Sequence, residues 1–175
     1  VDLLMRVGID SAIYRSQLAG INSPLPAVPS LALGTGEVSL FEMVGAYQAI
    51  ANGGILKEPV YLTRIEDRNG SVLYERESAG GGTPLCTPEN AELMIEMLRG
   101  VANEGTASGL RSKYGIKADV AGKTGTTQNY SDGWFIGFTP GLVAGAWVGG
   151  DLQNVRFKTI QYGQGAYAAM PMWAG

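Results

Sequence analysis

Val120-Ala121-Gly122-Lys123-Thr124-Gly125-Thr126-Thr127 is the stretch that decides the fold of this chain. It is rich in glycine and hydroxyl side chains and holds one cation. Two more strand-like runs follow it, residues 133–139 and 142–149, and Thr139-Pro140-Gly141 joins them in a tight turn. We therefore expect three strands in an antiparallel meander, of which the first covers residues 119–127.

Two amphipathic helices are predicted before the meander. Ser39-Leu40-Phe41-Glu42 has the spacing of a capping box, and Asn52-Gly53-Gly54 ends the apolar periodicity that follows it. Thr87-Pro88-Glu89 begins the second helix with a capping hydroxyl and a proline at the first position, and Gly105 ends it. The serine of the capping box is also a candidate nucleophile, but the capping interpretation explains its spacing from the glutamate.

A β-hairpin and several connections are predicted from turn residues. Residues 59–67 and 71–77 alternate apolar and polar side chains around Asn69-Gly70, a tight turn that needs positive φ. Gly80–Gly82 is a flexible break, either a loop tip or an engineered splice. Residues 106–117 form a polar connection with room for one helical turn. These elements predict an α+β fold in which helices flank an antiparallel sheet.

The two ends of the chain are less regular. Residues 2–8 have the pattern of a helix that Gly8 ends, and a long irregular stretch is expected from there to Gly36. The tail from Gly163 is predicted to be helical, with an interruption at Pro171. The chain begins without methionine and inside a helical pattern, so we expect it to be a piece of a longer protein.

The composition excludes several classes of function. The chain has 175 residues, which suits one domain, and 45% of them are hydrophobic. A net charge of −3 implies no basic surface for nucleic acid. The absence of histidine excludes a Ser-His-Asp triad and any histidine metal site. Cys86 is the only cysteine, so it forms no intrachain disulfide and is expected to be a small, half-buried residue.

Three interpretations of the opening stretch compete. A phosphate-binding loop is excluded because its first glycine would have to stand at position 117, which is lysine, and because a strand follows instead of a helix. A glycine-rich strand with one surface lysine is the simplest alternative. A ligand-binding strand edge is the third, since three threonines beside one cation suit a carboxylate and an open edge suits an extended peptide.

The flanking residues favour the third interpretation. Residues 121–127, followed by Asp132-Gly133-Trp134-Phe135-Ile136-Gly137-Phe138-Thr139-Pro140 and Ala146-Trp147-Val148-Gly149, resemble the transpeptidase domain of penicillin-binding proteins, above all the class A, bifunctional type. Further runs fit the same family over nearly the whole chain: Pro29–Gly34, Ala46-Tyr47, Ala51–Gly54, Met97–Val101 and Glu104–Ala107. The resemblance implies the fold shared with serine β-lactamases and acyl transfer on peptidoglycan, without a metal or other cofactor.

The resemblance also implies roles for individual residues. The family uses a serine from an S-x-x-K motif, a second S-x-N motif, and Lys-Thr-Gly on a strand that lines the cleft. Lys123 would be the lysine of the third motif, and Thr124 and Thr126 would bind the carboxylate of the stem peptide or of a β-lactam. The amide of Thr126 would be one oxyanion-hole donor. Gly125 would let the ligand lie against the strand, and Thr127 supplies the third hydroxyl of the substrate-binding set.

One departure from the family pattern is decisive. No serine of this chain has lysine three residues later, and none has asparagine two residues later. In the family both motifs precede Lys-Thr-Gly, so the resemblance implies that residues 1–175 are the C-terminal part of one transpeptidase domain. Such a piece would be inactive alone, and its exposed sheet edge and apolar surface would favour self-association.

Rival functions stay open at the level of sequence. A D,D-carboxypeptidase or a serine β-lactamase of the same fold differs only in the acyl acceptor, and a non-catalytic peptidoglycan-binding module would keep Lys-Thr-Gly as a recognition edge. A glycosyltransferase domain upstream would favour the class A type. The resemblance further implies a bacterial protein in the cytoplasmic membrane, anchored through an upstream segment, with this domain on the extracytoplasmic side.

Overall fold

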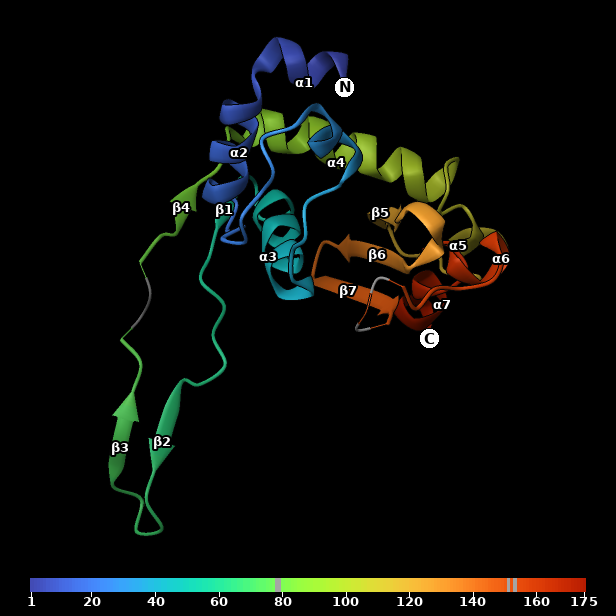
Figure 1. The fold of residues 1–175 in the computed structure, drawn as a ribbon. Helices are drawn as coiled ribbons and strands as arrows, with labels where there is room; N and C mark the ends of the chain where they lie inside the picture. The colour runs from blue at the N-terminus through green and yellow to red at the C-terminus, as the bar shows by residue number, and fades with distance from the viewer. Residues whose placement is uncertain (78–79, 151, 153) are drawn as a thin grey trace.

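A three-stranded antiparallel sheet with the order β5-β6-β7 forms the centre of the body (Figure 1). Its strands are β5 (Ala121–Thr126), β6 (Asp132–Thr139) and β7 (Leu142–Gly149). The computed structural model describes residues 1–77, 80–150, 152 and 154–175. The predicted meander is confirmed, because β6 and β7 are joined by a two-residue turn that places Thr139 opposite Leu142.

Helices and two smaller sheets make up the other elements. Strands β1 and β4 pair in one small sheet, and β2 and β3 pair in the other, both antiparallel. The predicted α+β class, an antiparallel sheet flanked by helices, is therefore confirmed. The elements are α1 (Asp2–Val7), α2 (Ile9–Leu18), η1 (Pro29–Leu33), α3 (Leu40–Ala51), β1 (Ile55–Leu56), β2 (Arg64–Glu66), β3 (Val72–Glu75), β4 (Thr83–Pro84), α4 (Pro88–Asn103), α5 (Gly109–Ser112), η2 (Gln128–Tyr130), α6 (Ile160–Gly163) and α7 (Ala169–Ala174).

Helices cover both faces of the sheet. A Cβ atom added to Gly145 of β7 would lie 2.6 Å from Val44 of α3, whereas one added to Gly137 of β6 would lie 2.9 Å from Trp173 of α7. Gly145 pairs with Ile136, the neighbour of Gly137, so the two glycines point to opposite faces. Glycine is required at both positions because the helices approach too closely for a side chain.

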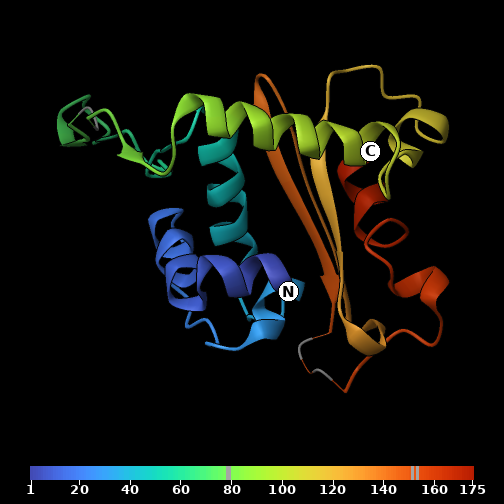
Figure 2. The same cartoon turned by 90° about the horizontal axis from the view of Figure 1, so that it is seen from above.

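Each face of the sheet carries its own apolar cluster. Helix α4 packs against β5 and crosses the strands in Figure 2, and it reaches both clusters. On the α3 face the buried members are Leu98, Ala121 and Phe138. On the α7 face they are Ala102, Ala107, Leu110, Val120, Phe135, Ala146, Ala169 and Met170. Packing against both faces of the sheet thus fixes the position of β5.

The predicted capping box at the start of α3 is confirmed. Ser39 Oγ accepts from the Glu42 amide at 3.2 Å, and the Glu42 carboxylate accepts from the Ser39 amide at 2.9 Å. The same carboxylate accepts from the amides of Asn22 and Ser23 and from the Ser23 hydroxyl. Bonds from Ser39 and Ser23 above all, and then from Asn22, lower the pKa of Glu42 to about 2. Glu42 therefore ties the segment after α2 to α3.

The predicted hairpin is confirmed with shorter strands, β2 and β3. Gly70 has φ 83°, but Asn69 does not have positive φ. Gly70 donates to the Asp67 carbonyl at 3.0 Å, and Asp67 donates to the Ser71 carbonyl at 2.9 Å, which describes a type I turn followed by a glycine bulge. Asp67 Oδ1 accepts from the Asn69 and Ser71 amides, and these bonds lower the pKa of Asp67.

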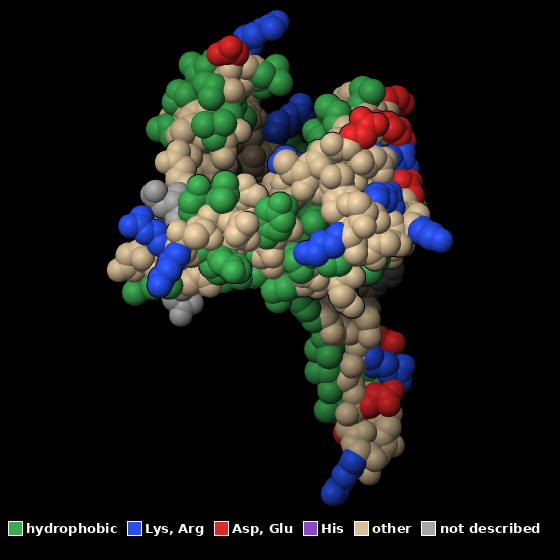
Figure 3. Space-filling view, turned by 90° about the vertical axis from the view of Figure 1, so that its right-hand side faces the viewer, with side chains coloured by type: hydrophobic (Ala, Val, Ile, Leu, Met, Phe, Trp, Pro, Cys, Tyr) green, Lys and Arg blue, Asp and Glu red, His purple; other side chains and the backbone are tan. Residues whose placement is uncertain are grey.

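This hairpin projects from the body as an arm (Figure 1). Figure 3 shows hydrophobic side chains along one side of the arm and charged ones along the other. On the charged side Arg64 forms ion pairs with Glu66 at 2.5 Å and with Glu75 at 3.5 Å. At the base of the arm, Tyr61 stacks on Phe41 of α3 with ring centroids 5.8 Å apart.

Two predictions near the chain ends are wrong. Residues 9–18 are not irregular but form α2, separated from α1 by Gly8 at φ 94°. The helical spacing of Ile9, Ala12 and Ile13 does indicate a helix. The prediction of an irregular segment gave more weight to the prolines that follow. Pro171 does not interrupt the C-terminal helix either. It is the third residue of α7, where a missing N–H costs no helical hydrogen bond, and the break lies between α6 and α7.

Candidate functional site

The outer edge of β5 carries the residues that the sequence singles out. Thr127 donates its amide to the Asp132 carbonyl at 3.3 Å, which identifies the hydrogen-bonded pairs of the β5-β6 ladder. Because such pairs alternate in an antiparallel ladder, the backbone groups of Thr124 and Thr126 point away from β6. Within the described part of the chain no other strand pairs with this edge. An extended ligand would find unpaired N–H and C=O groups there.

The charged and hydroxyl side chains of β5 lie on opposite faces of the sheet. Lys123 pairs with Ile136 and lies on the α3 face, whereas Thr124 and Thr126 pair with Phe135 and Gly133 on the α7 face. The Lys123 side chain is exposed, and its Nζ donates to the Thr124 carbonyl at 2.8 Å. The cation therefore lies along the same open edge to which the Thr124 backbone points, so that a ligand on this edge would meet both kinds of group.

Each threonine hydroxyl of the stretch has a specific partner. Thr124 Oγ1 lies 2.6 Å from Thr106 Oγ1, in the turn after α4. Thr126 Oγ1 accepts from the Gly165 amide at 3.1 Å, in the segment between α6 and α7. Thr127 Oγ1 lies 2.7 Å from Ser131 Oγ and accepts from the Asp132 amide at 3.0 Å. The hydroxyls of Thr124 and Thr126 thus contact the turn after α4 and the segment before α7, while the hydroxyl of Thr127 stabilises the turn from β5 to β6.

Packing within the protein requires glycine at position 122 and leaves little room for a side chain at position 125. A Cβ on Gly122 would lie 2.7 Å from the Ile136 carbonyl oxygen, and one on Gly125 would lie 3.0 Å from Trp134 Cβ. The segment around Gly165 also approaches this end of the strand, because a Cβ on Gly165 would overlap the carbonyl oxygens of Gly125 and Trp134. Glycine at position 125 is explained by these contacts without reference to a ligand.

Two arginines hold the beginning of β5 against α4. Arg99 of α4 makes a bidentate pair with Asp119, with Nη2 2.6 Å and Nε 3.2 Å from the carboxylate oxygens. Arg111 of α5 donates to Asn103 Oδ1 at 3.1 and 3.2 Å, to the Ile116 carbonyl at 2.8 Å and to the Ala118 carbonyl. The strand begins at Ala121, opposite Phe138 of β6, and not at residue 119 as predicted.

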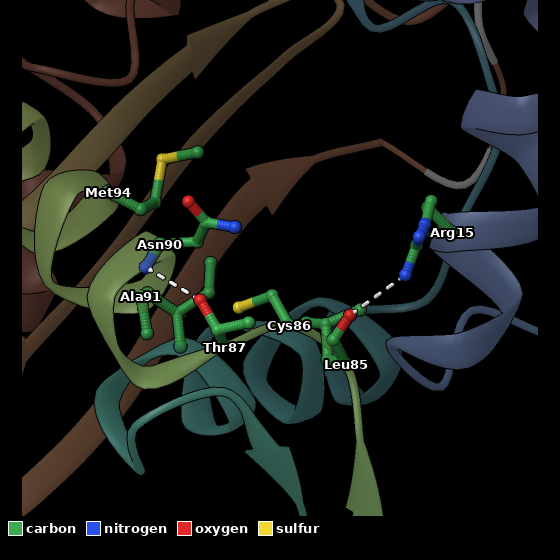
Figure 4. A pocket seen from close by; sticks show the side chains of 8 residues that line it. Arg15, Leu85, Cys86, Thr87, Asn90, Ala91 and Met94 are labelled. Atoms are coloured by element: carbon green, nitrogen blue, oxygen red, sulfur yellow. Dashed lines mark hydrogen bonds between the residues drawn. The ribbon is translucent and has the colours of Figure 1, made fainter.

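Two cavities of the described residues lie away from this edge. The larger, about 510 Å³, lies among α2, α3 and α4 (Figure 4). Half-buried Cys86, as expected from the sequence, lines it, and Arg15 at its border donates to the Leu85 carbonyl at 3.2 Å. The smaller cavity borders the base of the arm near Lys57 and Gly81. The candidate site is therefore an open strand edge and not an enclosed pocket.

Comparison with known proteins assigns the chain that carries this strand to a family. The family described as penicillin binding protein transpeptidase domain matches residues 15–166. The chain belongs to the penicillin-binding protein transpeptidase family. Penicillin-binding protein 1A of Aquifex aeolicus is 38% identical over 178 residues, which cover 99% of this chain and 23% of that protein. The chain thus spans less than a quarter of the length of this relative of the penicillin-binding family.

Solved structures of penicillin-binding proteins share the fold. The crystal structure of penicillin-binding protein 1A from Haemophilus influenzae matches with a TM-score of 0.86 and 26% identity over 98% of this chain and 30% of that one. PonA1 from Mycobacterium tuberculosis, solved in complex with penicillin V, matches with a TM-score of 0.72 and 24% identity over 91% of this chain and 46% of that one. The second likeness supports the fold only.

Sequence analysis located β5 but missed the partners of its hydroxyls. Thr106 and Gly165 lie 18 and 39 residues from the threonines that they contact. Thr106 belongs to the run Glu104–Ala107 that fits the family, which was the one available signal for it.

Among the helices of the described residues, none has both the length and the apolar composition to cross a membrane.

Proposed function

We propose that this chain is the C-terminal part of the transpeptidase domain of a peptidoglycan D,D-transpeptidase, and that β5 forms one wall of its acyl-transfer site. The observation that carries the proposal is the open edge of β5, where the backbone groups of Thr124 and Thr126 point outward and the Lys123 cation contacts the Thr124 carbonyl. Membership of the penicillin-binding protein family supports the same reaction class.

In this proposal the nucleophile is a serine outside the 175 residues. Thr124 and Thr126 donate their hydroxyl protons to the carboxylate of the stem peptide or of a β-lactam. The outward Thr126 amide donates to the carbonyl oxygen under attack and stabilises the negative charge that develops there. Lys123 adds a positive charge on the other side of the strand, which favours both the anionic ligand and the hydroxyl of the second motif.

We further propose a setting for the chain within a larger protein. Acyl transfer by serine and lysine needs no histidine, and this chain has none. We place the domain on the extracytoplasmic side of the bacterial cytoplasmic membrane, anchored through an upstream segment. Peptidoglycan stem peptides are the proposed substrate, and β-lactams are the proposed covalent inhibitors. Nucleic acid is not a proposed partner.

Replacement of Lys123 tests the proposal. In the full-length protein, Lys123→Ala is expected to slow acylation by a fluorescent penicillin by about 100-fold or more, the size of loss seen when one electrostatic group of such a site is removed. Lys117→Ala is the matched control, since Lys117 is also exposed but lies before β5. Acylation of Lys123→Ala at the wild-type rate would refute the assigned role.

A further inference from the structure

The turn after α4 presents Thr106 to β5 in a fixed position. Gly105 donates to the Gly100 carbonyl at 3.0 Å, and Ala107 donates to the Val101 carbonyl at 3.1 Å. A Cβ on Gly105 would lie 2.8 Å from Val101 Cα, and the Ala107 side chain is completely buried. Both neighbours of Thr106 are therefore held by the end of α4, and the residue between them cannot move independently of the helix.

The hydroxyl of Thr106 meets the hydroxyl of Thr124 at 2.6 Å. Helix α4 is also joined to the residues just before β5 by the bidentate pair of Arg99 and Asp119. The separation of the two hydroxyls is thus set by elements that pack together, not by a mobile loop. A hydroxyl has one proton to donate and two lone pairs that accept, so either residue can donate in the absence of ligand.

A bound carboxylate would decide which hydroxyl donates. If Thr124 gives its proton to the ligand, it can only accept from Thr106, and the chain of bonds runs from Thr106 to Thr124 to the carboxylate. We propose that Thr106 is a positioning residue, which orients the Thr124 hydroxyl toward a carboxylate-bearing ligand. This inference rests on the proposed function, since it assigns Thr124 to the ligand. Successive hydrogen bonds of this kind polarise one another, so the Thr124 hydroxyl becomes a better donor.

The expected size of the effect is modest. The net contribution of one neutral hydrogen bond corresponds to about threefold to tenfold in a rate. Thr106→Val keeps the shape of the side chain and removes the donor, whereas Thr106→Ser keeps the hydroxyl. Thr35→Val is a matched control, because Thr35 Oγ1 lies 3.3 Å from Ser30 Oγ in a second exposed hydroxyl pair remote in sequence from β5.

The test measures acylation of the full-length protein by a penicillin and by the methyl ester of the same penicillin. Thr106→Val is expected to slow acylation by the free acid about threefold to tenfold, while Thr106→Ser and Thr35→Val stay within about twofold of the wild type. In a Thr124→Val background the Thr106→Val effect is expected to disappear, because the two residues act in series. The ester, which has no carboxylate anion, is expected to show no Thr106 effect.

Three results would overturn the inference. They are a wild-type rate for Thr106→Val, an equal loss in the Thr124→Val background, and an equal loss with the ester. If Thr106→Val slowed acylation equally with the free acid, with the ester and in the Thr124→Val background, Thr106 would have a structural role in the turn after α4. The Lys123→Ala variant separates this inference from the proposed function. A wild-type acylation rate of Lys123→Ala would refute the proposed site itself. Slow acylation of Lys123→Ala together with a wild-type rate of Thr106→Val would refute only the positioning role of Thr106.

Discussion

At the scale of single residues, the edge of β5 depends on backbone contacts that admit no side chain. Gly165 is the clearest case, since its amide holds Thr126 Oγ1 while the carbonyl oxygens of Gly125 and Trp134 occupy the space that a Cβ atom would need. The residue thus links the tail of the chain to a hydroxyl proposed to bind the ligand. No pattern in the sequence marks it, because the contact joins residues 39 positions apart.

Gly165→Ala is predicted to weaken both the fold and the site. The added methyl group must displace the tail from β5, and overpacking of this kind costs about 1–3 kcal/mol. We expect a lower unfolding temperature and slower acylation by a penicillin. Gly141→Ala is the control, because nothing lies within 4 Å of the position of its Cβ. Equal behaviour of the two variants in thermal unfolding and acylation would contradict the packing argument.

At the scale of elements, α3 begins with a capping box that also fastens the preceding segment. Glu42 has a pKa of about 2 in the folded protein, lower than in the unfolded chain. A lowered folded pKa means that the stabilisation is present above the unfolded pKa and is lost as pH falls toward the folded one. We therefore expect stability to decline between about pH 5 and pH 2 in part because Glu42 is protonated.

Glu42→Gln tests this linkage. At pH 7 the variant is expected to be less stable than the wild type by about 1 kcal/mol, the usual worth of a helix cap. The difference should shrink as the pH is lowered toward 2, because the wild-type carboxylate is then neutral as well. Urea unfolding at a series of pH values measures both quantities, and Glu77→Gln, which changes an exposed acid outside the capping box, serves as a comparison. A difference that stays constant with pH would contradict the assignment.

The projecting hairpin contributes little to the stability of the body. All residues of β2 and β3 are exposed, and a two-stranded hairpin alone is marginally stable in water. Replacement of residues 62–76 by a short glycine-serine linker is predicted to change the unfolding temperature by less than about 2 °C, since little apolar area is lost. Loss of acylation by penicillin or a fall of more than about 5 °C would show that the arm supports the site.

Elements with local signals were predicted well, and those that depend on distant contacts were not. Short-range hydrogen bonds define the helix caps at Ser39 and Thr87 and the Pro-Gly turn between β6 and β7. Their partners are close in sequence, so the residue pattern predicts them. Helix α2 was missed because prolines further along the segment dominated its interpretation. Strand ends were predicted less well, because β5 begins two residues later than predicted and the hairpin strands β2 and β3 are shorter than predicted.

At the scale of the whole molecule, the described residues leave both edges of the three-stranded sheet unpaired and many apolar side chains exposed. The outer edge of β7 pairs with no strand of the described residues. Large apolar side chains are also exposed on several elements, among them Leu3, Leu33, Leu93, Met97 and Leu142. Unpaired edges and apolar surface of this kind favour association between chains. In the proposed complete domain, upstream residues would cover part of this surface.

The isolated 175-residue chain is therefore predicted to self-associate. Its apparent mass in light scattering is expected to rise with concentration, whereas the full-length protein in detergent should keep a constant mass. A chain that stays monomeric over a hundredfold range of concentration would contradict the prediction. This measurement is independent of catalysis, so it tests the exposed surface and not the site.

The central claim is that β5 is the wall of an acyl-transfer site whose nucleophile lies outside these 175 residues. Its most direct test labels the full-length protein with a penicillin, digests it, and maps the covalent adduct by mass spectrometry. We expect one adduct on a serine outside residues 1–175, lost or strongly reduced in Lys123→Ala, and no adduct on the isolated chain. An adduct on any serine within residues 1–175, or undiminished labelling of Lys123→Ala, would contradict it.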